Sequence, residues 1–126
     1  MASNTTTHTG SHADLLAQVS EAVTNFITDL NNQNIGDDVL AVTFSEFGRK
    51  AGENGNLGTD HGEIAPMFVF GSSLNAGISG TNINLSEAIA GNNFQIQTVQ
   101  HDYRRVFSTI LQDWFGVSNP TLDLTF

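Results

Sequence analysis

The sequence has no cysteine, two prolines and four basic residues among its 126 residues. Without cysteine the chain can form neither a disulfide nor a thiolate metal site, so any transition-metal site must use His, Asp or Glu. Thirteen acidic residues give a formal net charge of −9, which repels the phosphate backbone of nucleic acids. We therefore expect no nucleic-acid partner.

Long hydrophobic runs are also missing. No apolar stretch approaches the roughly 20 residues that a membrane-spanning helix needs. We therefore expect no membrane-spanning segment in this sequence. The N-terminal residues MASNTTTHTGSH lack both the basic and the apolar part of a signal peptide. The compartment therefore stays open between the cytoplasm and export directed by a signal outside this sequence. The composition includes 39% apolar and 9% aromatic residues, which is typical of a globular chain, and the length fits one domain.

Two segments predict amphipathic helices. From Ala13 to about Asn32 the apolar residues recur at helical spacing, so we expect one face of this helix to be buried. A second helix is predicted over Asp102–Phe115, with Asp102 as its N-cap and Gly116 placed to end it. The apolar positions of the first helix are Leu15, Leu16, Val19, Val23, Phe26, Ile27 and Leu30.

The segment between the helices predicts a strand, a glycine-rich loop and a second strand. Val39–Phe44 carries no charge and favours β structure, which fits a strand buried on both faces in a parallel sheet. Pro66 opens the second strand, Met67–Phe70. Further on, Leu85–Ala90 predicts one or two helical turns and Phe94–Val99 alternates as a strand does. The fold class is therefore α/β, with ligands expected beyond the carboxyl ends of the strands.

Several residues have the chemistry of metal ligands. His8 and His12 are four residues apart and share a face if the first helix extends back by one turn. The alternative is a mobile polar arm with two solvated imidazoles. Asp60 and His61 offer adjacent ligands suited to Zn²⁺ or Mn²⁺, or else a turn aspartate and a surface histidine. Glu46 follows a buried strand and is either a ligand or a turn cap.

Arg49 and Ser45 are the candidate substrate-binding residues. The planar fork of Arg49 matches phosphate, sulfate and carboxylate oxygens, although Arg49 is also placed to pair with Glu46. Ser45 lies in F-S-E-F-G, which is not the G-x-S-x-G nucleophile elbow. The sequence contains no P-loop or dinucleotide-binding fingerprint. The residues alone thus indicate a candidate metal site built from acidic and histidine side chains.

Three motifs together resemble a known family. They are T-F-S-E-F-G-R (Thr43–Arg49), N-G-N-L-G-T-D-H-G (Asn54–Gly62) and A-P-M-F-V-F-G (Ala65–Gly71). The family is the bacterial "domain of unknown function 1501", which is grouped with the alkaline phosphatase and sulfatase superfamily. The likeness continues through His12–Leu16 and Asp102–Gly116, and covers roughly residues 8 to 118.

This resemblance implies a partial alkaline-phosphatase-like parallel sheet flanked by helices, with a two-metal site at the strand ends. In the superfamily one metal is held by Asp-x-x-x-His before a helix and by a later His before a Pro-led strand. His12 and His61 match these histidines by context, while the aspartate position falls on His8. The second metal's Asp-His pair is replaced by Ser45 and Glu46. Asp60 is then an extra ligand or a partner that orients His61.

The resemblance also implies how the chain is divided. Residues 1–11 would be a flexible arm, 12–118 the C-terminal half of a phosphatase- or sulfatase-like domain, and 119–126 a tail. Relatives are several times longer, and the half that carries the Ser or Thr nucleophile of the superfamily is not in this sequence. The resemblance slightly favours a periplasmic or extracellular location.

Three functions follow as hypotheses. The first is a metal-binding portion of a hydrolase acting on small anionic esters, partnered by a complementing N-terminal half or by further copies of itself. The second is a non-catalytic remnant that acts as a structural or self-assembling module through an exposed sheet edge. The third is a protein that binds Ca²⁺ or an anionic glycan, which the acidic composition alone suggests.

Overall fold

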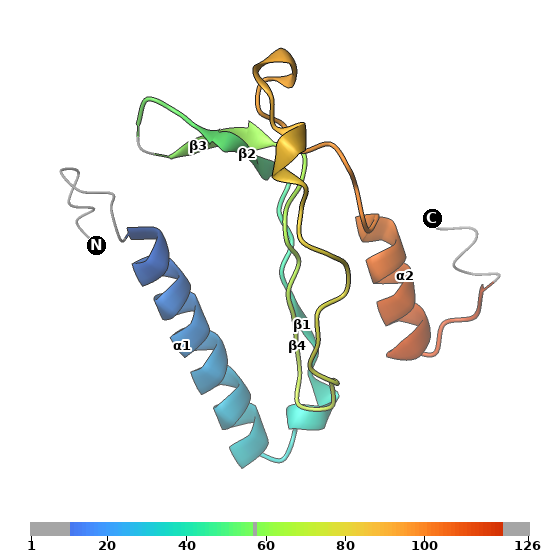
Figure 1. Cartoon of the computed structure of the whole chain (residues 1–126). Helices are drawn as coiled ribbons and strands as arrows, with labels where there is room; N and C mark the ends of the chain where they lie inside the picture. The colour runs from blue at the N-terminus through green and yellow to red at the C-terminus, as the bar shows by residue number, and fades with distance from the viewer. Residues whose placement is uncertain (1–10, 57, 120–126) are drawn as a thin grey trace.

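Two helices flank a narrow set of strands in the computed structural model, which describes residues 11–56 and 58–119 (Figure 1). In chain order the elements are α1 (Ser11–Asn32), the 3₁₀ turn η1 (Gly36–Asp38), β1 (Ala41–Val42), β2 (Gly48–Glu53), β3 (Thr59–Gly62), β4 (Val69–Phe70), the 3₁₀ turns η2 (Leu85–Glu87) and η3 (Ala90–Asn92), and α2 (Tyr103–Asp113). The chain is therefore a mixed α/β protein.

The strands form two separate antiparallel pairs. The segments predicted as strands at 39–44 and 67–70 do pair, but they run antiparallel, with Ala41 opposite Phe70 and Val42 opposite Val69. The second pair is β2 with β3. A parallel pair needs a crossover connection, usually a helix, whereas the described residues between β1 and β4 form the β2–β3 hairpin instead of a helix. The described residues thus contain no parallel sheet, and β1 is half-buried rather than buried on both faces.

Helix α1 has nearly the predicted bounds. It ends where Asn34 takes a left-handed φ of 58° and Ile35 donates its N–H to the carbonyl of Leu30. His12 lies in the first turn of α1, while His8 lies outside the described residues. Whether the two histidines share a face therefore stays a prediction, as do the expectations for residues 1–10 and 120–126.

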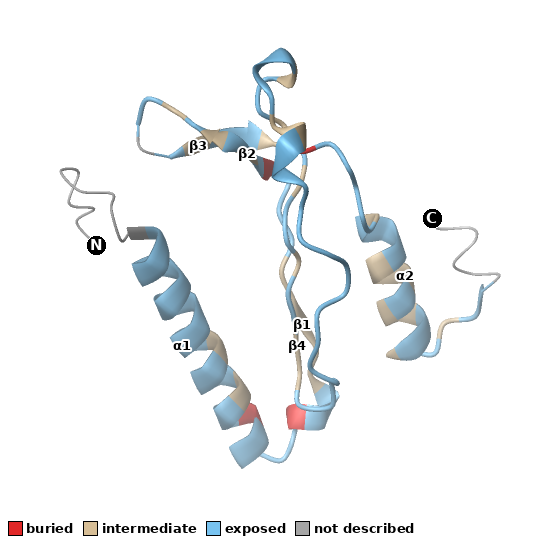
Figure 2. Cartoon of the chain, in the orientation of Figure 1, coloured by how far each residue is buried: buried red, intermediate tan, exposed pale blue. Residues whose placement is uncertain are grey.

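The apolar face of α1 is mostly uncovered, which corrects the expectation of a buried face. Leu30 is buried at 7% exposure, but Leu16, Val19 and Phe26 are 52%, 54% and 48% exposed. The reason is that α1 packs mainly on η1, which lies at its C-terminal end (Figure 2). The helix forms as predicted, but within the described residues most of its length has nothing to pack against.

Helix α2 begins after its predicted cap and ends at Asp113, two residues before the predicted end at Phe115. The side chain of Asp102 caps it by accepting the N–H of Arg104 at 2.9 Å. At the other end Gly116 has a φ of 67°, and Val117 donates its N–H to the carbonyl of Leu111. No residue of α2 is buried, so its apolar face is also incompletely covered.

The strand predicted over Phe94–Val99 does not form. Asn93 and Phe94 both take left-handed φ values, 59° and 58°, which turn the chain sharply. The N–H groups of Gln97 and Thr98 are then taken by the carboxylate of Glu87, so they are not available to a strand ladder. The helical turns predicted over Leu85–Ala90 are present as η2 and the start of η3.

Little apolar surface is buried. Leu30 and Ile96 are the buried hydrophobic residues of the part that the structure describes. The accessible surface is 9721 Å² for a mass of 13.5 kDa. A compact monomer of this mass exposes roughly 6,500 Å², so the chain exposes about half as much again. Neither described helix combines the length and apolarity needed to cross a bilayer.

We predict that Gly48→Ala destabilises the fold. A Cβ at Gly48 would overlap the backbone of Ile64, so the hairpin must shift. The expected loss is about 1–3 kcal/mol in the free energy of unfolding, measured by urea denaturation followed by circular dichroism. The control is Gly55→Ala, because a Cβ there meets nothing within 4 Å. Equal midpoints for the two variants would contradict the prediction.

Candidate functional site

The hairpin of β2 and β3 carries most of the predicted site residues. Its turn is built by Asn54, whose side-chain oxygen accepts the N–H groups of Asn56 at 2.9 Å and Gly58 at 3.2 Å. Gly48 lies opposite Gly62, where a Cβ on either residue would overlap neighbouring backbone. The turn and the paired glycines together set the register of the hairpin.

The hairpin rests on the loop that follows η3. Ala51 donates its N–H to the carbonyl of Phe94 at 3.0 Å, and Glu63 donates its N–H to the side chain of Gln95 at 3.2 Å. The ring of Phe94 lies so close to Gly52 that a Cβ there would crowd it. These contacts explain why Phe94 holds its left-handed conformation, and they give the site a fixed base.

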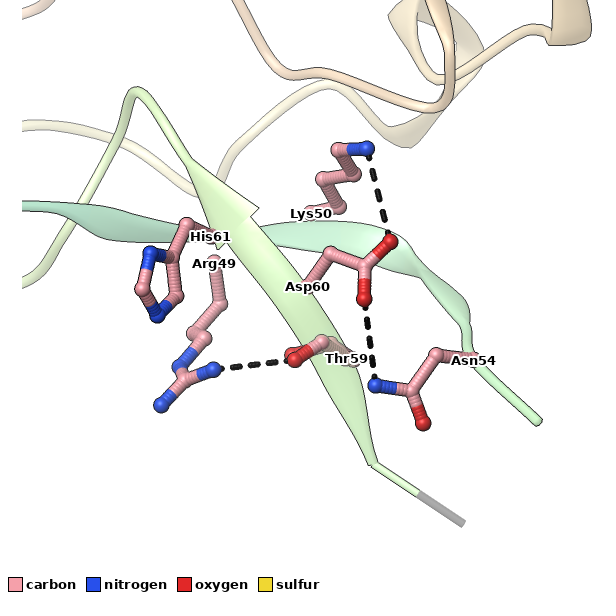
Figure 3. Close-up of a pocket in the computed structure, with 6 residues that line it drawn as sticks. All are labelled: Arg49, Lys50, Asn54, Thr59, Asp60 and His61. Atoms are coloured by element: carbon pink, nitrogen blue, oxygen red, sulfur yellow. Dashed lines mark hydrogen bonds and ion pairs between the residues drawn. The ribbon is translucent and has the colours of Figure 1, made fainter. Parts of the chain in front are cut away.

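One face of the hairpin joins an arginine, an aromatic ring and an imidazole. Arg49 is directly opposite His61 in the register, so the two side chains share a face. The rings of His61 and Phe47 are stacked with centroids 3.5 Å apart, and the guanidinium of Arg49 lies 5.4 Å from the Phe47 centroid. Arg49 Nη1 also donates to the carbonyl of Thr59 at 2.9 Å (Figure 3). The guanidinium is thereby positioned while it remains exposed to solvent.

The other face carries an ion pair. Lys50 Nζ lies 3.5 Å from Asp60 Oδ2, and Asn54 Nδ2 donates to Asp60 Oδ1 at 3.2 Å (Figure 3). The hydrogen bond from Asn54 and then the positive charge of Lys50 lower the pKa of the Asp60 carboxyl below its ordinary value. Asp60 is exposed, so this pair stabilises the hairpin modestly.

This arrangement bears on the predicted metal site. Successive side chains of a strand point to opposite faces, and Asp60 and His61 indeed diverge from β3 (Figure 3). His12 lies on α1 and Glu46 in the loop between β1 and β2, and both are exposed. Among residues 11–56 and 58–119 no three His, Asp or Glu side chains are placed to hold one ion. The metal site therefore stays a prediction, with His8 outside the described residues.

The remaining candidates have local contacts. Ser45 donates its hydroxyl to the carbonyl of Phe47 at 2.9 Å, which stabilises the turn into β2. The ion pairs of the described residues are Lys50 with Asp60 and Arg104 with Asp102, so the alternative of an Arg49–Glu46 pair is not observed. A shallow open depression on the hairpin is lined by Arg49, Lys50, Asn54, Thr59, Asp60 and His61.

Four residues of this site were not predicted, namely Phe47, Lys50, Asn54 and Thr59. The signal for the hairpin was Asn54-Gly55, a dipeptide that favours tight turns between strands. That signal places strands on both sides of the turn. Because side chains alternate along a strand, it also places Asp60 and His61 on opposite faces.

The sequence matches the model of a protein family described as "Protein of unknown function (DUF1501)" over residues 6–121. This range includes all three motifs that carry the resemblance, from Thr43 to Gly71. No curated protein and no solved structure matches the chain.

We predict that Asn54→Ala raises the pKa of Asp60 toward its ordinary value of about 4, because it removes the largest cause of the lowering. Since the folded pKa is lowered, the stability that Asp60 contributes is present above the ordinary pKa. It is lost as the pH falls through the folded pKa. The measurement is an NMR titration of the side-chain carboxyl. Asn56→Ala is the control, and an unchanged Asp60 pKa in Asn54→Ala would refute the assignment.

Proposed function

The chain belongs to the DUF1501 family, and from that membership we propose that it is the C-terminal portion of a phosphatase- or sulfatase-like hydrolase acting on anionic esters. In this proposal the hairpin β2–β3 binds the anionic group of the substrate. The observation that carries the proposal is the placement of Arg49 and His61 on one face of the hairpin.

The chemistry of this face suits a tetrahedral anion. A guanidinium has five N–H donors in a planar fork, and Arg49 uses one nitrogen to bind the carbonyl of Thr59. Its outer edge is left to meet two oxygens of a phosphate or sulfate group, with the His61 imidazole as a further donor. Asp60 also lines the depression on the hairpin, but its side chain diverges from His61, and its charge is offset by Lys50 Nζ at 3.5 Å. The face thus offers an anion local donors in a chain whose net charge is −9.

The unpaired edges of β1 and β4 leave room for further strands. Within the described residues β1 and β4 pair with each other and with no further strand, so each has a free edge. We propose that a complementing polypeptide adds strands parallel to the strand whose edge they join. The other strand of the pair would then be the antiparallel edge of the superfamily's mostly parallel sheet. The complementing polypeptide would also supply the nucleophile.

Metal binding has less support than anion binding. His61 is the ligand that we retain from the predicted set of His8, His12, Glu46, Asp60 and His61, and further ligands for Zn²⁺ or Mn²⁺ would come from outside the described residues. Asp60 and His61 diverge from β3, so their side chains do not converge on a position where both would hold one ion.

A second candidate function is a structural or self-assembling module without catalysis. The large exposed surface and the uncovered apolar faces of both helices favour it. The two candidates differ in what the hairpin does, because an assembly module has no need of an anion-binding face.

We predict that the protein binds inorganic phosphate or sulfate at Arg49. Titration with each anion separately, followed by NMR, should shift the side-chain signals of Arg49 and His61 in a saturable way. Arg49→Gln should weaken binding about tenfold or more, since hydrogen bonds to charged groups contribute about 1.5–3 kcal/mol. The control Arg105→Gln removes an arginine of α2 and should bind as the wild type does. Equal affinities for all three proteins would rule out this role of the hairpin.

We predict, separately, near-stoichiometric Zn²⁺ or Mn²⁺ in protein purified without a histidine tag or chelator. Elemental mass spectrometry should show that the metal falls in His61→Ala and is retained in His101→Ala, because His101 lies elsewhere and contacts Ser79. A folded wild-type protein without metal would contradict the prediction of metal binding. The prediction of anion binding would not be affected, because the phosphate and sulfate titrations test it separately.

A further inference from the structure

The uncovered face of α1 has the pattern of a helix–helix seam. Its core positions are separated alternately by four and three residues, which is the heptad spacing of a coiled coil. Leu30, at the C-terminal end, is buried within its own chain, whereas Leu16, Val19 and Phe26 are each about half exposed. The full seam is His12, Leu16, Val19, Val23, Phe26 and Leu30.

The charges of α1 lie away from this seam. The helix contains no Lys or Arg, and its acidic residues are Asp14, Glu21 and Asp29. Asp14 and Glu21 each precede a seam position by two residues, which places them on the opposite face of the helix. Asp29 lies at the edge and accepts a hydrogen bond from Gln33 Nε2 at 2.8 Å. A partner that approaches the seam between Leu16 and Phe26 therefore meets an apolar surface without carboxylates, although the chain as a whole is strongly acidic.

We propose that a second copy of the chain covers this face, with the two α1 helices packed antiparallel about a two-fold axis near Glu21. The intervals between successive seam positions are four, three, four, three and four residues, so the order is the same from either end of the helix. Two antiparallel copies can therefore match position for position. In this register Leu16 faces Phe26 of the partner subunit, and Val19 faces Val23 of the partner subunit. The four apolar positions between His12 and Leu30 are then paired in both copies, and the C-terminal end of α1 keeps its packing on η1 of its own chain.

The antiparallel arrangement follows from the charge of η1. Asp37 and Asp38 stand just beyond the C-terminal end of α1. A parallel pair would bring these acidic turns from both copies together. An antiparallel pair separates them by about the length of a 22-residue helix, roughly 33 Å. That distance is about three times the Debye length of roughly 10 Å at 0.1 M salt, so their repulsion is screened.

The uncovered apolar positions also form one continuous stripe. Leu16, Val19 and Phe26 are each about half exposed and follow one another along a 22-residue helix. Since the seam shares no residue with the hairpin, the dimer does not depend on the proposed anion site.

The first test is the mass of the purified chain in solution over a range of concentrations, measured by light scattering coupled to size exclusion. We expect a dimer whose dissociation constant rises at least tenfold in Val23→Glu. Gln18→Glu adds the same charge to the outer face of α1 and should leave the dimer unchanged. Circular dichroism should show equal helix content for both variants. A wild-type monomer at every concentration, or an unaffected Val23→Glu dimer, would overturn the proposal.

The second test uses the absence of cysteine, which lets a single introduced thiol report on the register. In the proposed dimer the two copies of Ala22→Cys are offset by about 3 Å along the helices, and the two copies of Ala13→Cys by about 24 Å. A short bismaleimide should therefore link Ala22→Cys at least tenfold more than Ala13→Cys. Equal linking at both positions would indicate a parallel pair, and linking at neither would exclude the seam.

Discussion

The register of the β2–β3 hairpin is the constraint on which the site depends. Gly48 and Gly62 face each other where neither strand has room for a Cβ, and this close approach places Arg49 opposite His61. A slip of one residue would send every side chain of a strand to the other face. The register therefore separates two kinds of chemistry, an exposed guanidinium and imidazole on one side and the Lys50–Asp60 ion pair on the other. Phe47 matters because its ring supports both Arg49 and His61.

The sequence predicted the elements whose formation depends on local chemistry. Helix α2 followed from its apolar spacing, its Asp102 cap and Gly116, and all three are present. The sequence also predicted strands at residues 39–44 and 67–70. Apolar patterns, however, contain no information on whether two strands run parallel or antiparallel. The strand at Phe94–Val99 failed because the distant carboxylate of Glu87 takes its N–H groups.

The candidate site was predicted by residue type more than by geometry. Arg49 and His61 were identified because their side chains suit anions and metals, and they do share a face. The pairing of Asp60 with His61 was inferred from adjacency in the sequence, which in a strand has the opposite consequence. The hairpin itself was missed because G-R-K-A-G-E lacks the apolar alternation that marks most strands.

The short β1–β4 ribbon has a consequence for the order in which the chain folds. The two helices and the β2–β3 hairpin each join residues that are close in sequence, so they can form within microseconds. The β1–β4 ribbon instead pairs two residues of each strand, Ala41 with Phe70 and Val42 with Val69, so the chain between them must first close into a loop. The few hydrogen bonds of so short a ribbon offset little of the chain entropy that this closure costs. The amides of the ribbon should therefore exchange with solvent hydrogen sooner than those of the hairpin, so the two ends of the molecule separate more readily at this ribbon than the hairpin opens.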